Sequence, residues 1–157
     1  MEAEVNSKVP ALASLICRGV AVRDIPDIFR LCHQLGYEPR QIGFGDQIAD
    51  IIESPGNAIF VAADTEDTAV GFIHVYIRHS VEIKACAQIQ ALVVACSARR
   101  QGAAKLLMGA AEEWARAEGL QWLSLYCSSY RDSAHDFYEA QGFDAVTTAT
   151  RFNKKID

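Results

Sequence analysis

Apolar and polar positions along this chain switch repeatedly between strand spacing and helix spacing, which predicts a mixed α/β fold. Short apolar runs bounded by polar or glycine residues predict strands, and apolar residues recurring at i, i+3, i+4 and i+7 predict helices. The expected strands cover 15–22, 58–63, 69–77, 83–95, 122–127 and 145–155. The expected helices cover 24–36, 46–53, 101–118 and 133–140.

Two of the helices have clear boundary signals. Asp24 is a candidate N-cap, Pro26 lies in the first turn, and Gly36 supplies a stop. The apolar stripe of this helix consists of Ile28, Leu31, Cys32 and Leu35. The longest helix stops at Gly119, and its expected buried stripe consists of Ala103, Leu106, Leu107, Ala110, Trp114 and Ala117.

The strands indicate how the sheet is built. Residues 58–63 and 69–77 flank a polar turn and predict an antiparallel hairpin. The strand 83–95 has a near-continuous apolar end, which predicts burial on both faces there. The strand 122–127 follows the long helix and can lie parallel to the strand 83–95 that precedes the helix. The tail 145–155 carries enough Val and Thr to close the sheet with another strand.

The chain has the size of one ordinary domain. Half of its 157 residues are apolar and 22% are charged, which is a globular composition. Residues 1–12 are expected to form a flexible lead-in and residues 13–157 a single domain. The N-terminus has acidic residues where a signal peptide needs basic ones, and no apolar run is long enough to cross a bilayer. A cytoplasmic protein without a membrane partner is expected.

The net charge argues against a nucleic-acid partner, and the cysteines and histidines favour a protein without disulfides or a metal site. The net charge of −5 argues against a nucleic-acid partner, because phosphates require clustered Lys and Arg. The five cysteines are odd in number and form no Cys-x-x-Cys pair, so they are expected to be reduced, small apolar residues. The histidines lack zinc-ligand spacing with them, and no metal site is expected.

The turn between the fourth strand and the long helix is the most informative segment. Gly102, Ala103 and Ala104 let a ligand approach the backbone closely. The first N–H groups of the helix are free there, the helix dipole favours an anion, and Arg99 and Arg100 add positive charge. A pyrophosphate cradle is one interpretation. The other is that the small residues serve packing and the arginines are solvated surface.

Two blocks of sequence carry a family resemblance. Residues 99–104 read Arg-Arg-Gln-Gly-Ala-Ala, match the pattern Arg/Gln-x-x-Gly-x-Gly/Ala and follow a Leu-x-Val strand end. Residues 134–143 match Ala-x-x-Phe-Tyr-Glu-x-x-Gly-Phe. With both blocks in order, the sequence resembles the GNAT superfamily of acyl-CoA-dependent N-acetyltransferases over about residues 14–156. Residues 89–94, 131–138 and 151–154 are similar to aminoalkylphosphonate and kindred small-amine acetyltransferases.

The resemblance implies a fold and a cofactor site. The implied fold is a central mixed, mostly antiparallel sheet of six to seven strands, flanked by about four helices and split in a V between the fourth and fifth strands. The pantetheine arm of acetyl-CoA would add to the edge of the fourth strand, and its pyrophosphate would bind the N–H groups of 100–105. The implied cofactor-binding residues are Leu92, Val93, Val94, Arg99, Arg100, Gln101, Gly102, Ala103, Ala104, Lys105, Arg131 and Tyr138.

The implied catalytic residue is Tyr138, which matches the family's tyrosine. A phenol with a pKa of about 10 is protonated at neutral pH and can give its proton to the leaving thiolate. A backbone N–H near Val94 can polarise the carbonyl. The family's usual asparagine three residues before Ala134 is replaced by Arg131, which can instead contact a phosphate of CoA.

The general base is left open by the sequence. Many relatives carry a glutamate just before Leu-x-Val, where this chain has Ala91, with Gln90 beside it, and neither side chain takes a proton. His74, His79 and Glu82 are the candidates on the acceptor side, directly or through water.

The resemblance implies an enzyme that transfers the acetyl group of acetyl-CoA to a primary amine of a small molecule, by direct attack in a ternary complex. Because relatives are commonly dimers, it is compatible with a homodimer. Two alternatives remain open: a non-catalytic acyl-CoA-binding or sensing domain, and an acetyltransferase acting on protein lysines or N-termini. The identity of the amine and of the acyl group is not indicated.

Overall fold

The computed structural model describes residues 14–156. The chain divides into two compact units, one ending at Ser124 and the other beginning at Leu125. Each is described by itself. The expected lead-in over residues 1–12 lies outside the described residues, and the single domain over 13–157 stays a prediction. No helix within residues 14–156 is long and apolar enough to cross a membrane.

The first unit is built on a sheet whose strands follow the chain in order. Antiparallel pairing joins neighbours from β1 to β4, and β5 comes next to β4 in the sheet order. The bounds are β1 Ile16–Gly19, β2 Asn57–Ala63, β3 Ala69–Arg78, β4 Cys86–Val94 and β5 Leu123–Leu125. The expected hairpin is confirmed, since Phe60 pairs with Ile73 across β2 and β3. Its turn is closed by Asp64, whose carboxylate accepts hydrogen bonds from the N–H groups of Glu66 and Thr68.

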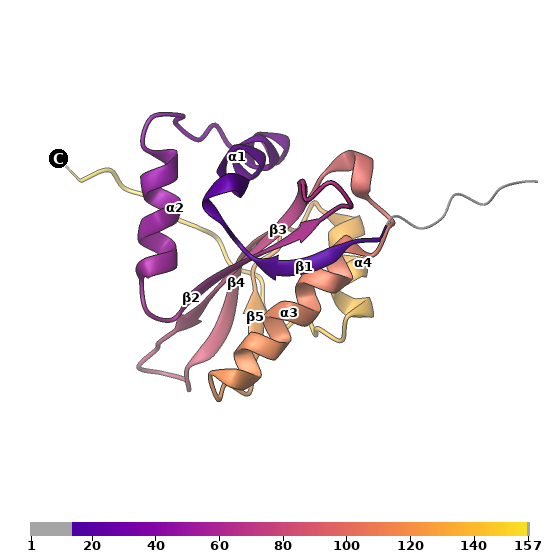
Figure 1. The fold of residues 1–157 in the computed structure, drawn as a ribbon. Helices are drawn as coiled ribbons and strands as arrows, with labels where there is room; N and C mark the ends of the chain where they lie inside the picture. Colours follow the sequence, from indigo (N-terminus) through magenta and orange to yellow (C-terminus); the bar gives the residue numbers. More distant parts are fainter. Residues whose placement is uncertain (1–13, 157) are drawn as a thin grey trace, which may run out of the picture. The chain divides into compact units, whose positions relative to one another are not determined.

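Helices cover both faces of this sheet (Figure 1). The bounds are α1 Ile25–Gln34, α2 Phe44–Glu53 and α3 Ala103–Ala117. The helices α1 and α2 lie on one face, and α3 lies on the other. One core cluster joins the first face to these two helices; its buried members include Ile28, Leu31, Phe44, Ile48, Ile59, Val61, Phe72 and Val93. Because strand side chains alternate between faces, Ile73 and Val75 of β3 point the other way, and both are fully buried.

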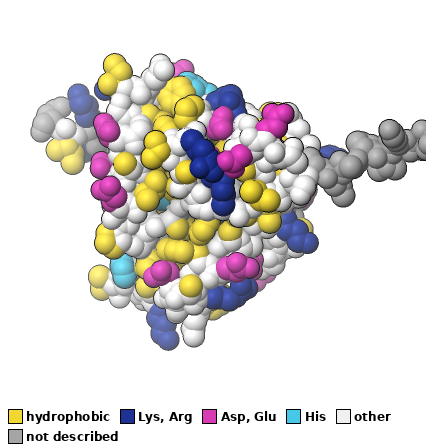
Figure 2. All heavy atoms as spheres, in the orientation of Figure 1, with side chains coloured by type: hydrophobic (Ala, Val, Ile, Leu, Met, Phe, Trp, Pro, Cys, Tyr) yellow, Lys and Arg dark blue, Asp and Glu magenta, His cyan; other side chains and the backbone are white. Residues whose placement is uncertain are grey.

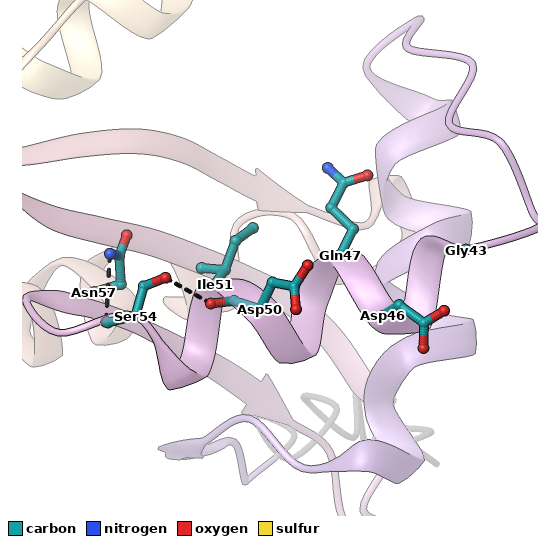
Figure 3. Close-up of a pocket in the computed structure, with 7 residues that line it drawn as sticks. All are labelled: Gly43, Asp46, Gln47, Asp50, Ile51, Ser54 and Asn57. Atoms are coloured by element: carbon teal, nitrogen blue, oxygen red, sulfur yellow. Dashed lines mark hydrogen bonds between the residues drawn. The ribbon is translucent and has the colours of Figure 1, made fainter.

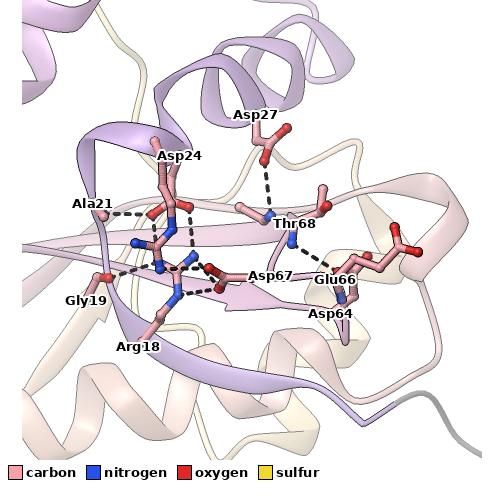
Figure 4. A network of polar contacts seen from close by, with 11 residues as sticks. Arg18, Gly19, Ala21, Asp24, Asp27, Asp64, Glu66, Asp67 and Thr68 are labelled. Atoms are coloured by element: carbon pink, nitrogen blue, oxygen red, sulfur yellow. Dashed lines mark hydrogen bonds and ion pairs between the residues drawn. The ribbon is translucent and has the colours of Figure 1, made fainter.

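Asp24 precedes α1 as predicted, but its side chain does not cap the helix. Its carboxylate accepts two hydrogen bonds from the guanidinium of Arg18, at 2.7 and 2.9 Å, and one from the N–H of Ala21 at 2.7 Å (Figure 4). Arg18 and Arg23 also pair with Asp67 of the β2–β3 turn, at 2.9 and 2.7 Å. The carboxylate is thus taken up by Arg18 and by the N–H of Ala21 and not by the first turn of α1, so this network joins β1, the start of α1 and the hairpin turn.

The buried face of α3 agrees with the predicted stripe at Ala103 and Leu107 and differs from it elsewhere. Its fully buried residues are Ala103, Leu107, Met108, Ala111 and Ala115. The predicted residues Leu106, Ala110, Trp114 and Ala117 instead line an open groove of about 770 Å³ beside β1. Apolar side chains are visible between charged ones on the face that carries β1 and α3 (Figure 2). The helix has alanines around most of its circumference. The spacing of apolar residues therefore did not determine which side faces the sheet, and the predicted buried side was shifted by about one residue.

The second unit holds α4, Asp132–Ala140. Gly142 ends it as predicted, with a φ of +89° and with N–H bonds from Gly142 to Glu139 and from Phe143 to Tyr138. The predicted strand over 145–155 is wrong, because no strand is present there and Val146 and Phe152 are 88% and 90% exposed. The described residues therefore form five strands, not six or seven. A strand needs a partner edge, and composition does not reveal whether one is available.

Candidate functional site

The backbone of the turn after β4 is unusual. A short 3-10 helix spans Cys96–Ala98, Arg99 is extended, and Arg100 has a φ of +60°. Gly102 is the N-cap of α3 with a φ of +83°. A positive φ is uncommon for a residue other than glycine and is often found at functional sites. The turn thus holds two left-handed residues within three positions.

This turn leaves polar groups available to a ligand. The first bond of α3 runs from the N–H of Leu106 to the carbonyl of Gly102, and no side chain caps the helix. The N–H groups of residues 103–105 therefore have no helical acceptor. A Cβ added at Gly102 would meet nothing within 4 Å, so the space over the turn is open. An anion is favoured at such a helix start.

The side chains around the turn are positively charged. Arg99, Arg100 and Lys105 are all exposed. Gln101 is half-buried and donates from Nε2 to the carbonyl of Ser97 at 3.3 Å, which braces the turn from within. Ala103 is buried against the sheet. The predicted cradle residues 99–105 are therefore brought together, with their charges and free N–H groups on the outside.

The end of β4 has a backbone edge that faces away from β3. The N–H of Ala95 donates to the carbonyl of Val70 on β3, at 2.7 Å. Because backbone polar groups alternate between the two edges of a strand, the N–H and C=O groups of Leu92 and Val94 point away from β3. The predicted residues 92–94 thus present one edge for additional hydrogen bonds. Burial on both faces there was wrong, since only Val93 is fully buried and the continuously buried run is 86–89.

A side chain from α1 already occupies part of this edge. Gln34 donates from Nε2 to the carbonyl of Val94 at 2.9 Å, and its Oε1 accepts from the N–H of Cys96 at 3.0 Å. Sixty residues separate Gln34 from Val94, and no sequence pattern links them. Sequence reasoning missed Gln34.

A β-bulge lies in the middle of β4. His74 of β3 pairs with Ala91, whereas the next residue, Val75, pairs with Ile89. Gln90 is the extra residue, and it is exposed. His74 therefore stands directly across from Ala91, on the sheet face covered by α1 and α2. Directly opposed residues have Cβ atoms about 4.5–5.5 Å apart.

His74 is held by a partner that sequence reasoning also missed. Its Nε2 lies 3.1 Å from Oδ1 of Asn57, and the Asn57 amide nitrogen in turn points to the carbonyl of Ser54 at 3.5 Å. This orientation of the amide makes Nε2 of His74 the donor and leaves Nδ1 as the acceptor. Burial lowers the pKa of His74 below 6.5, so the ring is neutral at pH 7. The other candidate bases, His79 and Glu82, are exposed beyond the end of β3.

A pocket of about 550 Å³ lies along α2 (Figure 3). It is lined by Gly43, Asp46, Gln47, Asp50, Ile51, Ser54 and Asn57. Two exposed carboxylates, Asp46 and Asp50, give it a negative lining. At its end, Asn57 connects it to His74 through the hydrogen bond just described.

Tyr138 lies in the second unit, on α4. Its ring packs edge-on against Phe137 and Phe143, with centroids 5.4 and 5.9 Å apart, and it is half-buried. Burial and then the nearby Cys127 raise the pKa of Tyr138, and Arg131 opposes them. The phenol is therefore protonated at neutral pH. Arg131 precedes α4 and is exposed.

The described cysteines are all free, and no group of three or more metal-ligating side chains occurs among residues 14–156. Burial raises the pKa of the Cys17, Cys32 and Cys127 thiols, in the first case with the help of Glu113. Thiols of raised pKa are poor nucleophiles.

A comparison with known protein families matches most of the chain. Residues 22–143 fit the acetyltransferase (GNAT) family. The chain belongs to the GNAT family of acetyltransferases. It is an acyl-CoA-dependent acetyltransferase with acetyl-CoA as its co-substrate. The open, cationic turn 99–105 suits the diphosphate of that cofactor, and the edge of β4 that faces away from β3 suits the amides of its pantetheine arm.

Solved structures of the same fold include several aminoglycoside acetyltransferases. Aminoglycoside N-acetyltransferase AAC(6′)-Iy in complex with CoA matches with a TM-score of 0.83 and 20% identity, over 94% of this chain and 99% of that one. The same protein with the bisubstrate analogue CoA-S-monomethyl-acetylneamine matches with a TM-score of 0.81 and 20% identity, over 92% and 100%. AAC(6′)-Ih from Acinetobacter baumannii matches with a TM-score of 0.79 and 17% identity, over 92% and 100%.

At 17–20% sequence identity, the similarity to these structures shows that the chain shares their fold. No curated protein matches this acetyltransferase. Which of its residues bind CoA, which act in catalysis and which amine is acetylated are therefore matters for proposal.

Proposed function

We propose that this acetyltransferase moves the acetyl group of acetyl-CoA onto a primary amine of a small molecule, by direct attack in a ternary complex. The observation that carries the proposal is the turn after β4, which combines free N–H groups, open space over Gly102 and three exposed cations. Holding both reactants in one site supplies much of the rate, since good orientation is worth roughly 7–11 kcal/mol.

The cofactor is held by residues of two kinds. The N–H groups of 103–105, together with Arg99, Arg100 and Lys105, bind the diphosphate. The strand end 92–94 holds the pantetheine arm: the N–H and C=O groups of Leu92 and Val94 bond it along the edge that faces away from β3, while Val93 between them stays paired with Phe72 of β3. Gln101 and Gly102 shape the turn, Ala103 and Ala104 let the backbone approach, and Arg131 contacts a phosphate. Acetyl-CoA itself supplies the activated acyl group.

The acceptor amine binds on the α2 side of the sheet. The carboxylates of Asp46 and Asp50 attract a cationic amine to the pocket there. Support for a small acceptor comes from the related fold, whose members include acetyltransferases named for aminoglycosides. The limited pocket volume of about 550 Å³ is of the size that holds small ligands.

His74 is the general base. It stands across from Ala91, where relatives carry a glutamate, so its imidazole replaces the missing carboxylate. The bond to Asn57 leaves Nδ1 unprotonated, and the lowered pKa keeps the ring neutral at pH 7. The amine proton passes to Nδ1 directly or through one water.

Tyr138 is the general acid. Its raised pKa keeps the phenol protonated, so that it gives its proton to the departing CoA thiolate. The proton lost by the amine and the proton gained by the thiol then balance. A backbone N–H at the end of β4 polarises the carbonyl. A homodimer and a cytoplasmic location remain predictions.

The second candidate is a non-catalytic domain that binds acyl-CoA. Ala91 favours it, because the strand position that holds a carboxylate in many relatives has no proton acceptor of its own. Thiol release from acetyl-CoA in the presence of amines separates the two functions, since a sensing domain binds the cofactor but releases no thiol.

The cofactor site is tested by thermal melting with and without acetyl-CoA. A ligand at 100 times its Kd stabilises by about 2.7 kcal/mol, which raises Tm by about 5–10 °C for a protein of this size. Gly102→Glu should abolish the shift. Gly36→Glu is the matched control, because Gly36 has a φ of +82° and equally open surroundings at the end of α1.

A shift in the wild type and in Gly36→Glu, but not in Gly102→Glu, supports the cradle. No shift in the wild type overturns it. A panel of aminoglycosides, polyamines, aminophosphonates and lysine peptides, read by thiol release, then identifies the acceptor class; release with peptides alone would replace the small-molecule acceptor by a protein.

A further inference from the structure

Gln34, the last residue of α1, bonds the end of β4 through both atoms of its carboxamide. Nε2 donates to the carbonyl of Val94 at 2.9 Å, and Oε1 accepts from the N–H of Cys96 at 3.0 Å. The side chain is exposed, as is Cys96. A primary amide thus lies against two backbone groups at the point where β4 runs into the turn.

The arrangement imitates an added strand. A residue on a neighbouring strand offers one donor and one acceptor to the same edge, namely its own N–H and its own C=O, which belong to two consecutive amides. The N–H of Ala95 bonds Val70 of β3, so the carbonyl of Val94 and the N–H of Cys96 point to the opposite edge. This is the edge to which the pantetheine arm adds in the proposed function, and pantetheine also carries amides.

We propose that Gln34 is a displaceable placeholder for the amides of the pantetheine arm: it satisfies the β4 edge while no cofactor is bound and yields that edge when CoA enters. The inference rests on the proposed function of the β4 edge. An N–H has a single hydrogen, so the N–H of Cys96 cannot bond Gln34 and a pantetheine carbonyl together at full strength. The two successive trans amides of pantetheine can together replace the carboxamide, because the N–H of one and the C=O of the other can face the same edge.

The exposure of Gln34 makes the exchange possible. Bonds between exposed groups have a small net strength because water competes for both partners. Releasing Gln34 into solvent therefore leaves no buried polar group unsatisfied. A permanent structural clamp would instead be buried, as Asp24 is in the network at the other end of α1.

The test is the affinity for CoA of Gln34→Ala, measured by titration calorimetry. Removing the competitor should tighten CoA binding about threefold to tenfold, the worth of one hydrogen bond. Binding of adenosine 3′,5′-diphosphate, which lacks the pantetheine arm, should not change. Gln41→Ala is the control, because Gln41 is an exposed glutamine in the α1–α2 loop whose carboxamide has no bonding partner among residues 14–156.

A second readout follows the contact without ligand. Amide hydrogen exchange at Cys96 should be faster in Gln34→Ala than in the wild type, and CoA should restore protection in both. Unchanged exchange would show that the contact does not form in solution and would overturn the inference.

The outcomes separate this inference from the proposed function. Unchanged or weaker CoA binding by Gln34→Ala, with normal binding by the wild type, overturns the placeholder alone. If neither protein binds CoA, the cofactor site itself is wrong and the inference falls with it. If adenosine 3′,5′-diphosphate binding tightens as well, Gln34 acts on the whole turn and is not a pantetheine surrogate.

Discussion

The ion pair between Asp24 and Arg18 allows us to predict how much the free energy of unfolding falls when Asp24 is replaced. Asp24 is 1% exposed, and its carboxylate accepts bonds from both terminal nitrogens of Arg18 and from the N–H of Ala21. Replacing Asp24 by alanine leaves the guanidinium without its main partner and the N–H of Ala21 without an acceptor. Three of the bonds in Figure 4 are lost together.

The magnitude follows from what remains. Breaking a buried ion pair by removing one partner costs about 3–5 kcal/mol. Arg18 keeps Asp67, whose Oδ1 lies 2.9 Å from Nη2, so its charge is not left isolated. We therefore expect Asp24→Ala to lower the free energy of unfolding by about 3 kcal/mol, near the lower limit. For a protein of this length, the fall in Tm is about 6–12 °C.

Urea unfolding followed by circular dichroism at pH 7 measures this loss. Asp50→Ala is the control, because Asp50 lies exposed in the middle of α2, where a change should stay within about 0.5 kcal/mol. A loss below about 1 kcal/mol for Asp24→Ala would refute the reasoning, since the buried pair would then contribute no more than an exposed one.

The same variant has a defined pH dependence. Burial alone would raise the pKa of Asp24, but the bonds from Arg18 and Ala21 outweigh it and the pKa is lowered. The stabilisation is therefore fully present above the unfolded-state pKa of about 3.9 and is lost as the pH falls through the folded-state value. The difference between wild type and Asp24→Ala should shrink below pH 4. A difference that stays constant down to pH 2 would contradict the assignment.

Three further outcomes are expected. Tyr138→Phe should lower kcat of acetyl transfer about 10²-fold or more with little change in KM for acetyl-CoA, and a raised KM with an unchanged kcat would mean that Tyr138 only binds. His74→Ala should lower kcat similarly; because burial lowers the pKa of His74, wild-type activity should persist below pH 6.5, and a rate limb at or above 6.5 would exclude His74 as the base. Gly71→Ala should destabilise by about 1–3 kcal/mol in thermal melts, because a Cβ would lie 2.8 Å from the carbonyl of Val93; a neutral result would show that β3 and β4 can separate there.

Residues close together in the sequence were enough to predict most helices and strands and the order in which they occur. Pro26 and Gly36 are near the boundaries of α1, since Pro fits only a first turn and Gly favours the left-handed residue after a helix. The β2–β3 hairpin followed from two apolar runs and a polar turn. The open turn before α3 could also be predicted, because small residues, arginines and a helix start are consecutive in the chain; its role as a cofactor cradle stays a prediction.

Long-range contacts decided the remainder. The buried side of α3 depended on which of its small residues met the sheet, and the tail over 145–155 depended on an available edge. The Asp24 side chain does not cap the helix, because the guanidinium of Arg18 is the stronger, charged partner. Gln34 on Val94 and Asn57 on His74 join residues far apart in sequence, and spacing carries no information about such pairs. The sequence by itself determined where the turn 99–105 lies, and only the tertiary structure decided which side chains from distant parts of the chain contact the end of β4 beside it.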